Sequence, residues 1–173
     1  MIASDESYDA ETGLLSPSGL EQAVESELAR ASRHEIPVSL VYMEVSAGAD
    51  VVADPAALRR LAARVAEALL GAVRAEDRVA RLATLRFAVL ASETGDSRAL
   101  AGRLEQHVHR HLGALSGDTT LAVAAVDCQF DEMSREQLMV ETERQLAATI
   151  LRERDIAFPP PAPPAPREIR QTG

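Results

Sequence analysis

The chain has 173 residues, is 46% hydrophobic and carries a formal net charge of −9, and all of its Lys+Arg residues are arginine. This length and composition exclude a disordered polypeptide and fit one domain with a full core. An acidic chain without a basic face does not suit binding to nucleic acid or to an anionic membrane surface. The single cysteine, Cys128, excludes an internal disulfide and is typical of a protein of the reducing cytoplasm.

The N-terminal part of the sequence predicts a lead-in followed by a helix. Residues 1–12 are polar and acidic and have no signal-peptide pattern, so we expect them to be flexible. Ser18 with Glu21 three residues later predicts a capping box. Apolar residues then recur at helical spacing, at Leu20, Val24, Leu28 and Ala31. Pro37 ends this helix.

The middle of the chain predicts a strand, a helix and a hairpin. Residues 38–45 are rich in strand-favouring residues and nearly continuously apolar, as in a central strand. Asp54 and Pro55 form a helix start, because an N-cap residue precedes a proline of the first turn. The apolar positions of this helix are Leu58, Leu61, Ala62, Val65, Leu69 and Val73. Strands 78–82 and 85–90 follow so closely on one another that they must form a hairpin.

The last third predicts a helix, a strand, a second helix and a tail. The first helix spans about 96–112 and the strand spans 119–126. Ser134 and Gln137 predict a capping box for the final helix. The inward positions of these two helices are Leu100, Leu104, Val108, Leu112, Leu138, Leu146 and Ile150. The proline-rich run 159–166 predicts an extended polyproline tail that packs on nothing, with a spacer role.

From residue 38 to 126 the order is β-α-β-β-α-β. This is the ferredoxin-like arrangement of the α/β (α+β) class, here with one additional helix at each end. We expect one domain over residues 13–155 and a disordered tail over 156–173. No run of apolar residues is long enough to predict a membrane span.

Two segments carry a resemblance to a known family. Residues 9–14 read D-A-E-T-G-L, and residues 74–90 read R-A-E-D-R-V-A-R-L-A-T-L-R-F-A-V-L. They resemble the motifs D-x-L-T-G-L and R-x-x-D-x-V-A-R-x-G-G-D/E-E-F-A-V-L of the GGDEF domain, the cyclase that joins two GTP molecules into cyclic di-GMP. The resemblance covers about residues 9–150 and implies the fold derived above.

The signature of that family is replaced in this chain by Ala83, Thr84, Leu85, Arg86 and Phe87. The family's two glycines let the backbone approach a triphosphate and accept positive φ, which added β-carbons oppose. Its third position supplies a carboxylate to the catalytic metals, for which the leucine here has no oxygen. The arginine reverses the charge of the fourth position. The resemblance therefore implies a degenerate, catalytically inactive domain.

Further family positions are also changed. Glu44 retains one carboxylate at the first metal position, but its longer side chain alone cannot hold Mg²⁺ in octahedral geometry, and we expect it to reach water at the strand end. The segment that reads guanine in the family is shortened here to residues 49–55. Residues 122–124 and 142–143 also depart from the family pattern. We therefore expect no catalytic residue, no metal site and no cofactor.

One family site is retained. Arg74 and Asp77 match the R-x-x-D inhibitory site, which binds cyclic di-GMP in the family, and Arg103 is the counterpart of a second arginine. An arginine fork can donate to guanine or phosphate, while a carboxylate accepts from guanine N–H groups. The competing interpretation is an exposed salt bridge or a cation at a helix C-terminus.

Other candidates have simpler interpretations. His107 and His111 lie four apart on a helix, but no third metal ligand has suitable spacing. Cys128 follows a strand without a neighbouring histidine and is interpreted as structural.

Three functions remain open at this point. The first is an inactive GGDEF-like receptor for cyclic di-GMP that relays the signal to a protein partner or a second copy of itself. The second is an interaction or dimerisation module without a ligand, and the third is an enzyme of altered nucleotide chemistry.

Overall fold

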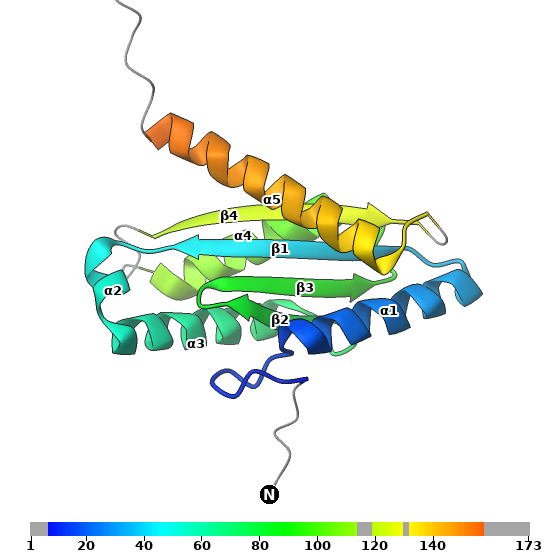
Figure 1. Cartoon of the computed structure of the whole chain (residues 1–173), viewed down its shortest axis with the longest axis horizontal. Helices are drawn as coiled ribbons and strands as arrows, with labels where there is room; N and C mark the ends of the chain where they lie inside the picture. The colour runs from blue at the N-terminus through cyan, green and yellow to red at the C-terminus, as the bar shows by residue number, and fades with distance from the viewer. Residues whose placement is uncertain (1–6, 114–118, 130–131, 158–173) are drawn as a thin grey trace, which may run out of the picture.

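The computed structural model describes residues 7–113, 119–129 and 132–157, with nine helices and strands in these ranges (Figure 1). In chain order they are α1 (Pro17–His34), β1 (Val38–Ser46), α2 (Ala49–Ala53), α3 (Pro55–Ala72), β2 (Arg78–Ala83), β3 (Arg86–Ser92), α4 (Ser97–Leu112), β4 (Thr120–Cys128) and α5 (Arg135–Ala157). The proline-rich run 159–166 lies outside the described residues, so its expected lack of packing stays a prediction.

The four strands form one antiparallel sheet in the order β2-β3-β1-β4. β1 lies inside the sheet, where Tyr42 is opposite both Ala88 of β3 and Ala124 of β4. The inner position explains why its sequence is almost continuously apolar, because both of its faces are covered. The predicted β-α-β-β-α-β order and the central place of residues 38–45 are confirmed.

Helices cover both faces of the sheet, and α5 crosses in front of it while α4 lies behind (Figure 1). Alternate residues of β1 point to opposite faces, so that Val41 and Met43 pack with α3 and α4. Leu40 and Tyr42 pack instead with the buried residues of α1 and α5. The two additional helices therefore complete a second apolar layer that a bare ferredoxin-like fold would leave open.

The helix starts follow the expected capping chemistry, with one correction. The N-cap of α1 is Ser16, whose Oγ accepts from the Gly19 amide over 3.1 Å, and not Ser18. Pro17 then occupies the first helical position, which suits its fixed φ. The capping box of α5 is confirmed, because the Ser134 amide donates to Gln137 and the Gln137 amide donates to Ser134 Oγ.

Two local features differ from the sequence-based expectations. Residues 7–12 were expected to be flexible, but the chain from Ser7 to Leu15 folds against the edge of the sheet. Leu15 donates its amide to Val79 over 3.0 Å and accepts from the Arg81 amide over 2.8 Å. The helix α2 was also unforeseen, since residues 49–55 were expected only as a shortened segment.

None of the helices in the described ranges has the length and apolar character needed to cross a membrane.

Gly19 offers a test of how tightly the N-terminal segment packs on α1. A β-carbon at Gly19 would lie 2.1 Å from the Ser7 carbonyl oxygen, closer than any real contact allows. We expect Gly19→Ala to lower the free energy of unfolding by ~1–3 kcal/mol, measured by urea denaturation. Gly102→Ala on α4 is the matched control, because its β-carbon would meet nothing within 4 Å. That control should gain up to ~1 kcal/mol, and equal behaviour of the two variants would contradict the packing described here.

Candidate functional site

The hairpin that carries the altered signature is built as a structural turn. Thr84 and Leu85 connect β2 to β3, and a register shift between Arg81 and Ala83 leaves an additional residue in β2. The side chain of Leu85 packs against the core on the α3/α4 side of the sheet. Its carbonyl accepts from the Val45 amide over 2.9 Å. The turn is therefore fastened to the end of β1.

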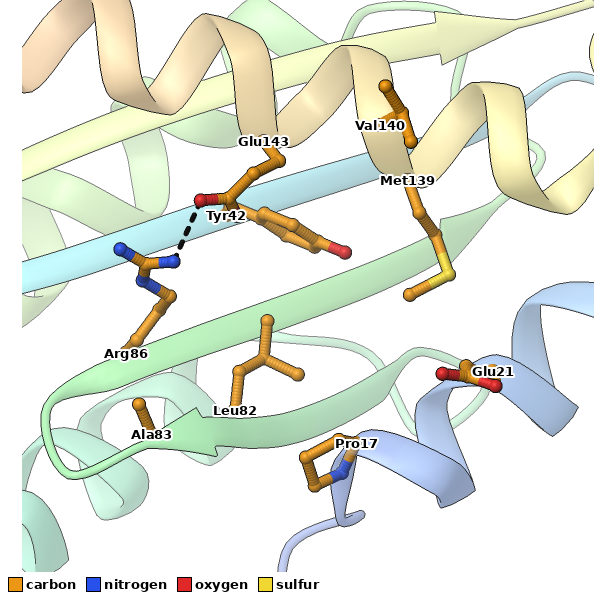
Figure 2. A pocket seen from close by; sticks show the side chains of 9 residues that line it. All are labelled: Pro17, Glu21, Tyr42, Leu82, Ala83, Arg86, Met139, Val140 and Glu143. Atoms are coloured by element: carbon orange, nitrogen blue, oxygen red, sulfur yellow. Dashed lines mark hydrogen bonds and ion pairs between the residues drawn. The ribbon is translucent and has the colours of Figure 1, made fainter.

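Arg86 is the first residue of β3, directly after the hairpin turn, and it connects β3 to β1 and α5. It lies directly opposite Glu44 in the β1–β3 register. Its Nε donates to Glu44 Oε2 over 2.7 Å, and its Nη2 donates to the same oxygen. Its Nη1 donates to Oε1 of Glu143 on α5 over 2.8 Å (Figure 2). The guanidinium thus pairs with both nearby carboxylates and connects the sheet to α5.

The electrostatics of this cluster favour the charged arginine. Burial alone would lower the pKa of Arg86, but the two carboxylates outweigh it and raise the pKa. Glu44 was expected to reach water at the strand end, but its side chain is only 26% exposed and is engaged by Arg86. A divalent cation that used the same Glu44 oxygen would have to displace the guanidinium.

A second feature of the hairpin region is a cavity of about 570 Å³ above the turn. Its wall is mostly apolar and consists of Glu44, Val45, Val52, Leu58, Ala83, Thr84, Leu85 and Arg86. The ion pair and the Thr84 hydroxyl are its only polar side chains. Within residues 7–113, 119–129 and 132–157, no group of three His, Cys, Asp or Glu residues gathers to hold a metal ion.

The D-A-E-T-G-L segment forms a turn that is tied to β2. Asp9 Oδ1 accepts from the Thr12 amide over 2.9 Å and from the Thr12 hydroxyl over 2.6 Å. Gly13 has φ 71°, a conformation that favours glycine. Arg81, only 8% exposed, donates to Asp9 over 3.1 Å and to Glu11 over 2.6 Å. This motif therefore has a structural role that does not depend on nucleotide chemistry.

The carboxyl of Asp9 also couples the turn to pH. Burial would raise its pKa, but hydrogen bonds from Thr12 and Arg81 outweigh burial and lower the pKa below the ordinary 3.8. A group whose pKa is lowered on folding contributes stability above its unfolded-state pKa. The contribution of this turn is therefore present at neutral pH and is lost as the pH falls through the lowered value.

Arg74 and Asp77 do not form a salt bridge with each other. The Asp77 Oδ2 atom accepts from the Arg74 backbone amide over 2.9 Å and closes the turn between α3 and β2. Its Oδ1 atom is buried and has no hydrogen-bond partner among the described residues. The Arg74 residue is exposed, and its guanidinium takes part in no ion pair within the described ranges. The acidic side chain therefore faces its own backbone, while the arginine faces solvent.

The packing of α3 on α4 places Arg103 at the same end of the molecule as Arg74 and Asp77. Arg64 of α3 donates to the His111 carbonyl over 2.7 Å. One to two turns further along α3, Gly71 lies against His107. The two helices therefore run in opposite directions, and the exposed Arg103 lies toward the end of α3 that carries Arg74. This places the predicted Arg74, Asp77 and Arg103 toward one end of the α3–α4 pair.

The two histidines and the cysteine considered in the sequence analysis lie in contacts between helices or in the buried core. His111 pairs with Glu67 over 3.8 Å, whereas His107 packs against α3. Cys128 is the last residue of β4 rather than a residue after it, and burial raises the pKa of its thiol. Both observations fit the simpler interpretations given above.

Sequence reasoning missed two residues of the hairpin region. Glu143 was noted only as a departure from the family pattern, and its pairing with Arg86 spans 57 positions of the chain. Tyr42, which lines a cavity beside Arg86, was hidden in a strand of apolar residues. The alternation of side chains along β1, which places Tyr42 and Glu44 on one face, was the available signal.

No family model matches the chain, and no curated protein matches it in sequence. Solved structures of GGDEF domains do match it in fold. The GGDEF domain of FimX from Pseudomonas aeruginosa has a TM-score of 0.70 and 18% identity, covering 84% of this chain and 94% of that chain. The GGDEF domain of DgcB from Caulobacter crescentus, solved in complex with c-di-GMP, has a TM-score of 0.72 and 15% identity, covering 88% and 92%.

A third match extends the comparison to an assembled cyclase. The diguanylate cyclase SiaD from Pseudomonas aeruginosa, solved with its activator SiaC, has a TM-score of 0.71 and 20% identity. The match covers 85% of this chain and 60% of the SiaD chain. At these low identities the likeness concerns the fold. The chain therefore has a mixed α/β, GGDEF-like fold with a four-stranded antiparallel sheet.

The Arg86 cluster makes a stability prediction. Arg86→Met keeps much of the side-chain volume but leaves Glu44 and Glu143 facing each other without a cation. We expect a loss of about 1–2 kcal/mol in the free energy of unfolding, allowing for partial solvent exposure. Arg144→Met on the outer face of α5 is the matched control and should change little, because in the described part of the chain Arg144 pairs only with its helix neighbour Glu141. Chemical denaturation at low salt checks both, and equal losses would contradict a specific role for Arg86.

Proposed function

We propose that this protein is a catalytically inactive GGDEF-like signalling domain that binds cyclic di-GMP through Arg74, Asp77 and Arg103. Binding would be relayed to a protein partner or to a second copy of the chain. The inactivity follows from the altered hairpin. Leu85 and Arg86 offer no carboxylate to a metal, and the retained Glu44 is held by the guanidinium of Arg86.

The observation that best supports the binding site is the state of Asp77. A buried carboxylate oxygen without a hydrogen-bond partner costs free energy, and a guanine N–H group is a fitting donor for it. The oxygen is shielded in the free protein, so a guanine reaches it only when the turn of residues 73–77 opens. The exposed guanidinium of Arg74 then lies three residues away and is free to contact the base or a phosphate.

The comparisons support the choice of ligand and of relay. A GGDEF domain with the same fold was solved in complex with c-di-GMP, and another was solved in complex with a protein activator. The present chain would bind the nucleotide and relay the signal without catalysing the synthesis of cyclic di-GMP.

A second candidate function is a protein-interaction module without a nucleotide. The helix α5 presents Val140 and Leu151 to solvent, with 67% and 61% of each residue exposed. Large apolar side chains on an outer helix face favour a protein contact. Both candidates share this surface, and nucleotide binding distinguishes them.

Calorimetric titration with cyclic di-GMP tests the proposal. We expect saturable binding to the wild type, and an affinity about ten- to a hundredfold lower for Arg74→Ala, because a charge-assisted contact contributes ~1.5–3 kcal/mol. Asp77→Asn should weaken binding similarly and should reduce the preference over cyclic di-AMP.

Arg60→Ala is the matched control, since it removes an exposed arginine at the opposite end of α3, where Asp54 at 3.6 Å is its only ion-pair partner among the described residues. It should leave the affinity unchanged. The absence of heat at high micromolar ligand, or an equal effect of the control, would contradict the binding proposal and leave the interaction module.

A further inference from the structure

A second cavity lies on the opposite side of Arg86 from the hairpin turn. It has a volume of about 330 Å³ and opens between the start of α1, the sheet and α5 (Figure 2). Its apolar walls are formed by Pro17, Leu82, Ala83, Met139 and Val140. This volume is at the low end for ligand pockets, which span ~300–1,000 Å³. The cavity therefore suits a small ligand or a single side chain better than a dinucleotide.

A polar group points into this cavity from the sheet. Tyr42 is only 3% exposed, and its hydroxyl is directed into the cavity between Met139 and Glu21 (Figure 2). Within the described part of the chain, this hydroxyl makes no hydrogen bond. The hydroxyl is not among the fully buried atoms that lack a partner, so it borders the open cavity and is available to a ligand.

The protonation state of Tyr42 is fixed by its surroundings. Burial, followed by the negative charge of Glu143, raises the pKa of Tyr42 to about 12. The neutral phenol is therefore favoured on folding, and the stability it contributes is present below the unfolded-state pKa of 10.0 and is lost as the pH rises through 12. At neutral pH the hydroxyl can both donate and accept.

The charge around the cavity is negative. Glu21 and Glu143 line it, and both act on the Tyr42 hydroxyl. The only cationic side chain in the wall is Arg86, which already binds Glu143 and Glu44. The wall thus carries two carboxylates against one guanidinium, and that guanidinium is shared with Glu44 outside the wall. An anion would be repelled, whereas a cation would gain charge-assisted hydrogen bonds.

We propose that this cavity binds an ammonium or guanidinium group carried on an apolar stem. The stem lies against Pro17, Leu82 and Met139, and the cationic head contacts Glu21, Glu143 and the Tyr42 hydroxyl. A free organic amine and a lysine or arginine side chain of a partner protein share this chemistry. The site is independent of the cyclic di-GMP site, because none of its residues is Arg74, Asp77 or Arg103.

The composition of the chain gives the experiment a local reporter. The sequence has two tyrosines and no tryptophan, so Tyr8→Phe leaves Tyr42 as the only tyrosine. Tyr8 is 55% exposed and lies outside the cavity, which makes this substitution mild. Tyrosine emission then reports on the cavity when the protein is titrated with pentylammonium, pentylguanidinium, pentanol or pentanoate.

We expect a saturable change with both cations, binding of pentanol at least about tenfold weaker, and no saturation with pentanoate, because the charged contacts are missing. Glu21→Gln should lower the affinity for both cations by about tenfold. The matched control Glu67→Gln removes an exposed carboxylate of α3 and should have no effect. Tyr42→Phe should lower the affinity for the cations while the fold is retained. Because this variant has lost the tyrosine emission, the methyl resonance of Met139 provides the readout.

Equal affinity for pentanol and pentylammonium would overturn the proposal, as would the absence of saturation in both readouts or an equal effect of Glu67→Gln. A capped tripeptide with a central arginine separates the two sources. Tighter binding of the peptide than of pentylguanidinium supports the side chain of a partner protein. Equal or tighter binding of pentylguanidinium supports a free amine.

Discussion

The ion pair of Arg86 with Glu44 and Glu143 organises the central region of this protein. Two carboxylates that converge between a sheet and a helix need a positive charge, which either a metal ion or a basic side chain can supply. Here a guanidinium from β3 supplies that charge from within the chain. The same side chain separates two cavities, one above the hairpin turn and one between α1 and α5. We therefore expect a change at this single position to alter both the stability of the fold and the charge of both cavities.

The residues of the family-like motifs have structural roles in this fold. Arg81 fastens the Asp9 turn to β2, and Gly13 adopts the positive φ that the turn requires. Asp77 closes the connection between α3 and β2 through the Arg74 amide. These interactions stabilise the fold whether or not a nucleotide binds. A resemblance confined to such positions therefore predicts the fold well and the activity poorly.

The element order, the central strand and the hairpin could be predicted because side-chain periodicity and turn length are local properties of the sequence. Long-range pairings could not. Arg81 reaches Asp9 across 72 positions, which is why residues 7–12 are ordered despite a polar composition. The inward direction of the Asp77 side chain also has no sequence signal, since an exposed Asp77 would leave the same R-x-x-D pattern. The N-cap at Ser16 was signalled by the following Pro17, but the neighbouring serine gave an equally plausible pattern.

We infer that the Arg86 guanidinium occupies the position where a metal ion would have to balance these carboxylates, so that the hairpin would not support cyclase chemistry. The most direct test is incubation of the wild-type protein with GTP and Mn²⁺, followed by chromatographic detection of cyclic di-GMP. The account predicts no product above a control without protein. Product that requires the protein and disappears in Glu44→Gln would contradict it, because it would show that Glu44 holds a catalytic metal despite its pairing with Arg86.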